Sequence, residues 1–278
     1  MQIYYIYHRN ARKMRNDYAL ITGATSGIGL EYARQMAARG YNLILVGIEA
    51  DKNCHVAEEL AAQWGIRALP IHADLAREQA AAEVYARVQE MGVEVSVLIN
   101  NAGMLLFSTL ARTALLPMEK IITLHCTTPT LLCRLFAEDM IRRDRGHILL
   151  MSSITAWTPY PTISHYAATK AYLKSFAESL WYELRDKGVS VTAVFPSAVD
   201  TPFYNLEEGQ RRTLRRLGVM LSAEEVARKA LRAMFSRRRR SLPGVLTKIE
   251  AAICYLLPAW ALLPILKIPA VKRILERI

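Results

Sequence analysis

Residues 18–29, YALITGATSGIG, place an apolar strand, a glycine-rich turn and the start of a helix in direct succession. The glycines of this turn are Gly23, Gly27 and Gly29. Glycine permits a tight turn and a close approach of the backbone, and the amide groups at a helix N-terminus attract an anion such as a pyrophosphate. The stretch therefore predicts a dinucleotide-binding turn after the first strand.

Strands and helices continue to alternate beyond this turn. The predicted strands are residues 18–22, 42–46, 66–71, 95–99, 147–151 and 189–195. The predicted helices are residues 27–39, 51–64, 77–91, 113–143 and 164–187. Nearly continuous apolar strands joined by helices indicate an α/β fold, in which helices cover both faces of a doubly wound parallel sheet. We predict one domain, residues 14–246, with an N-terminal extension, residues 1–13, and a C-terminal apolar helical extension, residues 247–278.

The composition of the chain favours a globular protein of a reducing compartment. It has 278 residues, of which 52% are hydrophobic and 22% are charged, and disordered chains are poorer in apolar residues. The four cysteines lack the spacing of zinc ligands, so we expect neither a metal site nor a disulfide scaffold. The first residues lack the pattern of a removable secretory signal. We therefore expect a cytoplasmic protein.

Positive charge is concentrated late in the chain. The formal net charge is +11, and residues 211–248 hold twelve basic and two acidic residues. Such a block is typical either of a solvated helix face or of contact with an anionic partner, such as a membrane surface. Because the sequence lacks a nucleic-acid-reading motif, we expect no specific nucleic-acid partner.

The apolar tail leaves two interpretations open. Residues 251–266, AAICYLLPAWALLPIL, are sixteen uncharged residues, fewer than the roughly 20 that span a bilayer. Two prolines interrupt them, which predicts short helical pieces. The tail either makes a peripheral membrane contact together with Arg237–Arg240, or folds back as a lid over the substrate cleft or as a dimer contact.

Three side chains after the later strands form a candidate catalytic group. Tyr166 and Lys170 are four residues apart on a predicted helix, so they share a face. A nearby ammonium group lowers the pKa of a phenol from about 10, so Tyr166 can exchange a proton with a substrate oxygen near neutral pH. Ser153, after the fifth strand, can hydrogen-bond the same oxygen.

Taken in order, these elements resemble the short-chain dehydrogenase/reductase family. The matching segments are the TGATSGIG turn, the NNAG segment at 100–103, the Ser153–Tyr166 spacing, the Y-x-x-x-K pair and the PSAVDT segment at 196–201. The resemblance covers residues 18 to about 246. It implies a Rossmann-fold, NAD(P)-dependent oxidoreductase that interconverts an alcohol and a carbonyl. It also implies that Lys170 contacts the nicotinamide ribose, and a homo-oligomer (dimer or tetramer) is expected.

The resemblance further implies a set of cofactor-binding residues. They are Gly23, Thr25, Ser26, Gly27, Ile28, Gly29, Glu49, Asp74, Leu75, Asn101, Ala102, Gly103, Tyr166, Lys170, Pro196 and Thr201. In the family, the residue matching Asp74 contacts adenine, and the one matching Asn101 lies near the adenosine ribose. Gly47 and Ile48 follow the second strand and offer neither a cation for a 2′-phosphate nor a carboxylate for a ribose diol. Glu49 would repel a phosphate, so the sequence favours NAD over NADP.

One position departs from the family pattern. Where the family has an asparagine whose main-chain carbonyl holds a water in a proton relay, this chain has His125. The histidine either preserves that carbonyl, or adds a titrating imidazole to the catalytic residues, or is a buried structural residue. The carbonyl interpretation predicts that His125→Asn is at least as active as the parent. If the presence of His125 in place of the family asparagine abolishes turnover in this chain, the protein is instead a dinucleotide-binding regulatory or scaffold protein.

The predicted substrate is a hydrophobic small molecule. Apolar and aromatic residues occur around the candidate site, although most pockets are largely apolar. They are Met104, Leu105, Phe107, Trp157, Tyr160 and Phe203.

Overall fold

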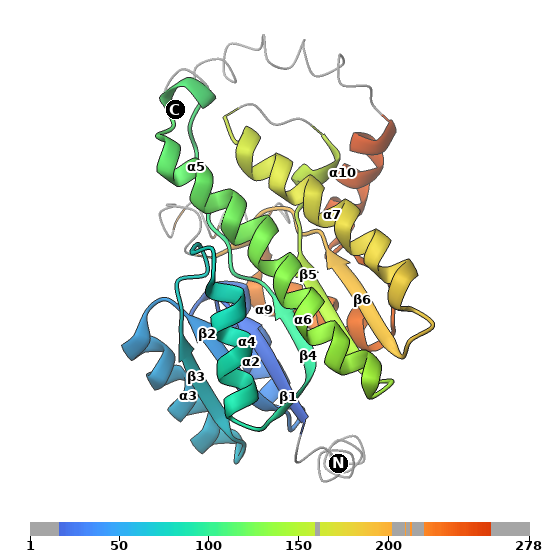
Figure 1. The fold of residues 1–278 in the computed structure, drawn as a ribbon. Coiled ribbons are helices and arrows are strands. Elements are labelled where there is room, and N and C mark those ends of the chain that lie inside the picture. Colours follow the sequence, from blue (N-terminus) through green and yellow to red (C-terminus); the bar gives the residue numbers. More distant parts are fainter. Residues whose placement is uncertain (1–16, 159–161, 202–208, 210–211, 213–219, 257–278) are drawn as a thin grey trace.

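The computed structural model describes residues 17–158, 162–201, 209, 212 and 220–256 (Figure 1). In this part of the chain, seven strands form one parallel sheet in the order β3-β2-β1-β4-β5-β6-β9. The strands are β1 Asp17–Thr22, β2 Asn42–Gly47, β3 Ala68–His72, β4 Glu94–Asn100, β5 Gly146–Met151, β6 Val189–Val194 and β9 Arg240–Ser241. The strand order reverses between β1 and β4, which confirms the predicted doubly wound sheet.

Helices cover both faces of the sheet (Figure 1). One face packs against α4 (Ala80–Glu90), α6 (Thr128–Arg142) and α7 (Ser164–Leu184). The other face packs against α2 (Gly27–Ala37), α3 (Ala50–Trp64) and α9 (Ala223–Phe235). Each buried Leu, Ile or Val side chain contributes about 1.5–3 kcal/mol. Strands that are buried on both faces therefore contain continuous apolar runs, as in β1 and β2, whereas the buried strand β6 also contains Ser190 and Thr192.

The predicted helix at 113–143 is wrong in one respect, because it is interrupted. It consists of α5 (Leu115–Ile122), the π-helical turn η2 (Thr123–Thr127) and α6, and the 3-10 turn η1 (Leu110–Arg112) precedes it. Pro129 explains the widened turn. It lacks the N–H that would bond the carbonyl of residue 125, and its ring would collide with that carbonyl in a regular α-helix.

Several short elements escaped prediction. They are η3 (Ile154–Trp157), β7 (Val199–Asp200), β8 (Leu221–Ser222) and β9. Two-residue strands are too short to show a periodic pattern. Helix α9 lies inside the predicted domain, and α10 (Val245–Leu256) forms the start of the predicted helical extension.

Both predicted extensions lie mostly outside the described residues. Residues 1–13 and 257–278 fall there, and α10 already begins at Val245, two residues before the predicted domain boundary. Among the described residues, every helix is too short or too polar to cross a membrane.

Candidate active site

A cavity of about 680 Å³ opens at the carboxyl ends of the strands. This is where ligands bind in doubly wound sheets, beside the point at which the strand order reverses. The cavity brings together fifteen of the sixteen predicted cofactor residues and three of the four predicted catalytic residues. The two exceptions are Gly29 and His125, neither of which contributes to its wall.

The glycine turn forms one wall of this cavity. Gly23 and Gly27 have φ angles of +66° and +53°, which L side chains rarely adopt, and the Gly23 N–H donates to the Val46 carbonyl at 2.8 Å. Ser26 is the N-cap of α2, so the N-terminus of this helix begins at the cavity wall. Gly29 lies behind the turn, where a Cβ atom would overlap the Gly23 carbonyl oxygen. Gly29 therefore acts by leaving room, and not by touching a ligand.

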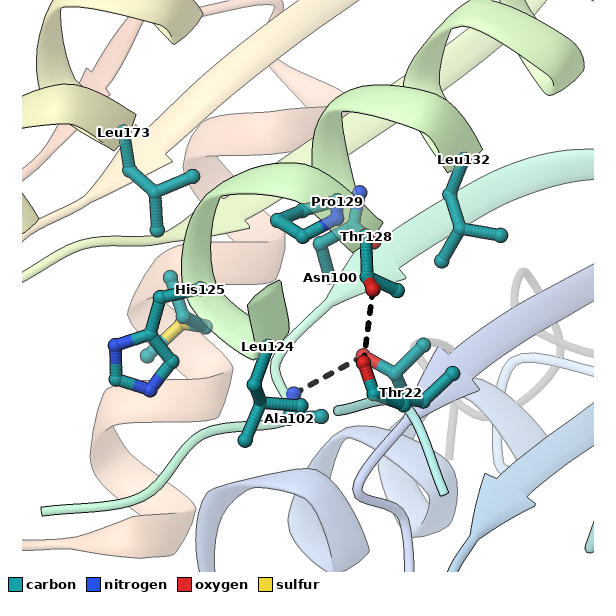
Figure 2. A pocket seen from close by; sticks show the side chains of 11 residues that line it. Thr22, Asn100, Ala102, Leu124, His125, Thr128, Pro129, Leu132 and Leu173 are labelled. Atoms are coloured by element: carbon teal, nitrogen blue, oxygen red, sulfur yellow. Dashed lines mark hydrogen bonds between the residues drawn. The ribbon is translucent and has the colours of Figure 1, made fainter. Parts of the chain in front are cut away.

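The NNAG segment, residues 100–103, connects the glycine turn to the end of β4 through hydrogen bonds. The Thr22 hydroxyl oxygen accepts hydrogen bonds from the backbone N–H groups of Asn101 and Ala102, at 2.9 and 3.0 Å. Figure 2 shows the bond from Ala102. The Asn101 side-chain amide donates to the carbonyls of Thr22 and Gly23, at 3.0 and 3.3 Å. The Asn101 side chain thus holds the turn in shape, while the residue also lines the cavity.

Ser153, Tyr166 and Lys170 line the same cavity, from the end of β5 and the first turns of α7. The Lys170 ammonium is 5.3 Å from the centre of the Tyr166 ring, which confirms that the two share a helix face. It donates to the Met151 carbonyl at 2.9 Å, and burial lowers its pKa from 10.5 to about 8. The Ser153 hydroxyl oxygen accepts from the Thr155 N–H at 3.2 Å, so its own proton can be donated to a ligand.

The end of β5 fixes the position of the catalytic helix. Ser152 donates from its hydroxyl to the main-chain carbonyl of Lys170 at 2.7 Å. Together with the bond from the Lys170 ammonium to Met151, this attaches one turn of α7 to the strand at two points. Both bonds are buried, which favours a rigid geometry at the site.

His125 lies beneath the cavity and not in its wall. Its ring is 1% exposed and lines a smaller cavity with Thr22, Asn100 and Thr128 (Figure 2). Burial, with a smaller effect from the Lys170 charge, holds the pKa of His125 well below 6.5. The imidazole is therefore neutral near pH 7, which argues against the titrating role considered above.

The end of β2 has the composition expected from sequence, with one additional contact. Gly47, Ile48 and Glu49 all line the cavity, and Ile48 is 60% exposed. The Glu49 carboxylate forms an ion pair with Lys52 at 3.1 Å. A cation thus stands beside the Glu49 carboxylate, and Asp74 supplies a second carboxylate to the cavity lining.

The predicted apolar surroundings are partly wrong. Leu105 and Phe107 line the cavity as expected, but Trp157 does not and packs on Phe195 with ring centres 4.3 Å apart. Met104 is absent from the lining, and its backbone N–H bonds to His125. Tyr160 and Phe203 lie outside the described residues.

Several lining residues escaped prediction. Ile154, Thr155 and Ile163 belong to no motif, and they line the cavity from the segment after β5 and the start of α7. Ser197, Ala198 and Val199 lie within the PSAVDT segment, of which only Pro196 and Thr201 were predicted to bind the cofactor.

Fold and site together define a dinucleotide-binding oxidoreductase of the doubly wound class. Comparison with known families makes this specific, because the model described as "short chain dehydrogenase" matches residues 17–211. The chain belongs to the short-chain dehydrogenase family. The resemblance seen in the sequence motifs is thereby confirmed.

The chain is also similar to individual proteins of this family. It is 34% identical over 197 residues to rat 17-beta-hydroxysteroid dehydrogenase type 3, covering 67% of this chain and 61% of the relative. It is 32% identical over 227 residues to the very-long-chain 3-oxoacyl-CoA reductase of Phaeosphaeria nodorum, covering 77% of this chain and 67% of the relative. The chain thus spans about two thirds or less of these relatives.

Solved structures agree with the fold. A short-chain dehydrogenase from Sphingobium yanoikuyae in complex with NADPH has a TM-score of 0.75 and 28% identity, covering 94% of this chain and 96% of that one. The bulky-bulky ketone specific alcohol dehydrogenase from Comamonas testosteroni has a TM-score of 0.72 and 27% identity, covering 87% and 94%.

Proposed function

We propose that this protein is an NAD(P)-dependent oxidoreductase that interconverts an alcohol and a carbonyl on a hydrophobic substrate. The observation that carries the proposal is the shared cavity, in which Ser153, Tyr166 and Lys170 face the same space as the glycine turn. A dinucleotide on the turn would extend its nicotinamide toward these side chains. The direct test is reduction of a panel of ketones, with NADH or NADPH consumption followed by absorbance.

Each catalytic side chain has a distinct role in the reaction. The bound cofactor supplies or accepts the hydride at the substrate carbon. In the reductive direction, Tyr166 donates its phenolic proton to the carbonyl oxygen, and in the oxidative direction it removes that proton from the alcohol. Ser153 donates a hydrogen bond to the same oxygen and orients it. Lys170 holds positive charge beside the phenol and would contact the nicotinamide ribose of a bound cofactor.

The substrate class is proposed from the apolar wall and from the relatives. Leu105, Phe107, Ile154 and Ile163 supply apolar side chains to the cavity lining. The two relatives compared above are named for a 17-beta-hydroxysteroid and for a very-long-chain 3-oxoacyl-CoA. The panel should therefore contain steroid ketones and long-chain 3-oxoacyl thioesters, with short polar ketones as controls.

We propose NAD as the preferred cofactor, on the carboxylate at the end of β2. Glu49→Gln should raise activity with NADPH relative to NADH by roughly two- to fivefold, the size of an exposed charge interaction. The effect is modest because Lys52 already pairs with this carboxylate. The measurement is kcat/KM with both cofactors. Glu58→Gln, an exposed carboxylate further along α3, is the matched control and should leave the ratio unchanged. A parent that prefers NADPH would contradict the proposal.

We further propose a homo-oligomer and a peripheral lipid contact through α10. This helix packs against η3 at the carboxyl edge of the sheet and leaves Val245, Ile249 and Ile253 between 48% and 75% exposed. Arg237 lies at the other edge, where it donates to the Gly188 carbonyl at 3.4 Å. Arg240, in contrast, lies in β9 beside the carboxyl half of β6. The joint contact of Arg237–Arg240 and the tail with one membrane surface stays a prediction, because residues 257–278 lie outside the described part of the chain.

Vesicle flotation tests the lipid contact. The full chain should float with neutral phosphatidylcholine vesicles, because the α10 contact is apolar. The double variant Ile249→Asp/Ile253→Asp should stay in the dense fraction and keep its activity. The lipid contact is excluded if the parent chain never floats. If the double variant then elutes from a sizing column as a smaller oligomer than the parent, α10 forms the dimer contact.

A further inference from the structure

We propose that His125 is a positioning residue. Its imidazole connects the cofactor loop, defined as residues 101–104 after β4, to the turn of α7 that carries Tyr166 and Lys170. The ring nitrogen Nε2 accepts a hydrogen bond from the Met104 N–H at 2.9 Å, and Nδ1 is 2.9 Å from the Thr169 hydroxyl. That hydroxyl donates to the main-chain carbonyl of Tyr166 at 2.8 Å. The inference rests on the proposed function only in assigning the acid/base role to Tyr166.

The chemistry of the donors fixes the direction of every bond in this chain. A backbone N–H only donates, so Nε2 presents its lone pair to Met104. A neutral imidazole then carries its proton on Nδ1, which donates to the Thr169 oxygen and leaves the hydroxyl proton for the Tyr166 carbonyl. Both ring nitrogens are thus occupied. His125 is therefore a bridge, and not a proton carrier.

Packing holds the ring in this orientation. His125 lies in the π-helical turn η2, a kind of bulge that often occurs at functional sites. A Cβ atom on Gly103 would lie 2.9 Å from Nε2, so the ring fits only because residue 103 is glycine. The His125 ring also packs edge-on against the Tyr166 ring, with 5.7 Å between the ring centres.

The bridge matters because it joins segments that are distant in sequence. Met104 follows the NNAG segment, which is bonded to the glycine turn, and Tyr166 begins the catalytic helix. A displacement of about 1 Å between a bound cofactor and the proton donor can cost roughly a hundredfold in rate. We therefore propose that His125 sets the distance between the cofactor loop and the Tyr166 hydroxyl.

Variants of His125 separate its side chain from its main-chain carbonyl. Asparagine places polar atoms at the level of Nδ1, and glutamine at the level of Nε2, so each keeps only one of the two bonds. His125→Asn and His125→Gln should each lower kcat/KM by roughly tenfold to a hundredfold, and His125→Leu should lower it at least as much. The pH profile should keep its shape in all three, because the ring does not titrate in the working range.

Thr169 provides a matched pair at the other end of the bridge. Thr169→Ser keeps the hydroxyl and should stay within about threefold of the parent, whereas Thr169→Val removes it and should lose about tenfold or more. The double variant His125→Leu/Thr169→Val should be no worse than His125→Leu alone, because the two residues act through one connection. The dissociation constant for NADH should also rise, little in Thr169→Ser and more in Thr169→Val and His125→Leu. Nucleotide fluorescence measures this constant without turnover.

Three results would overturn this assignment. One is a His125→Asn variant as active as the parent, because that outcome assigns the role to the main-chain carbonyl. Another is a shifted pH profile in His125→Gln, which would identify a titrating imidazole. The third is a 15N NMR spectrum of the ring with the proton on Nε2. Because the NMR result is independent of turnover, it tests the bridge even if no substrate is found and the proposed function fails.

Discussion

Replacing Tyr166 by phenylalanine is expected to lower kcat by roughly 10²–10⁴-fold, the usual contribution of a general acid/base. The phenolic oxygen is the atom proposed to exchange a proton with the substrate, and phenylalanine keeps the ring beside Lys170 and His125. The dissociation constant for the cofactor should change little. Steady-state rates and a fluorescence titration of NADH measure the two quantities.

A second tyrosine on the same helix provides the control. Tyr172 is 42% exposed and its hydroxyl is 2.8 Å from the Thr130 hydroxyl, away from the cavity lining. Tyr172→Phe should keep parental activity. Lys170→Ala, in contrast, should lower both turnover and cofactor affinity, because Lys170 is assigned to the phenol and to the ribose. Full activity in Tyr166→Phe would exclude the proposed mechanism. A parent that binds cofactor and alcohol at every pH without forming NADH would favour a regulatory or scaffold protein.

The sequence predicted the sheet well because the signal is strong wherever strands are buried on both faces. β2 and β6 are buried along their full length and lie within one residue of the predicted bounds. β2 contains the unbroken apolar run Leu43–Val46, whereas Ser190 and Thr192 alternate with apolar residues in β6. Helix α3 was equally clear, since its buried residues recur at helical spacing and Gly65 ends it in the left-handed conformation. Local pattern and tertiary burial agree in these elements.

The failures fall where tertiary contacts override local pattern. The interruption at η2 depends on one proline within an otherwise helical sequence, and the two residues of β9 pair with β6 only because α9 returns the chain to the sheet. The same limit applies to the site. The ordered motifs predicted which residues gather around the cavity, but the contacts of His125 with Met104 and Thr169 join positions 21 and 44 residues away. Sequence spacing carries no information about such contacts.

Gly29→Ala is the second substitution with a large expected effect. Helix propensity favours alanine at this position, whereas steric overlap opposes it. Gly29 lies inside α2, where alanine normally favours the helix by about 1 kcal/mol over glycine. A methyl group at this position would, however, overlap the Gly23 carbonyl oxygen and lie 2.6 Å from the Asn101 side-chain nitrogen. Overpacking costs typically 1–3 kcal/mol, and a backbone oxygen cannot rotate away as a side chain can. The steric effect should therefore exceed the gain in helix propensity.

Gly29→Ala is thus expected to weaken NADH binding at least tenfold (about 1.4 kcal/mol) and to lower the melting temperature. The displaced turn would lose the bonds from Asn101 to the Thr22 and Gly23 carbonyls, which set the shape of the proposed pyrophosphate site. Gly65→Ala is the matched control. Gly65 has a φ of +63°, and a methyl group added there would meet nothing within 4 Å, so alanine strains the backbone but should leave NADH affinity unchanged. If Gly29→Ala were more stable than the parent with unaltered affinity, helix propensity would outweigh the overlap, and the tight packing of the turn on α2 would not be needed for binding.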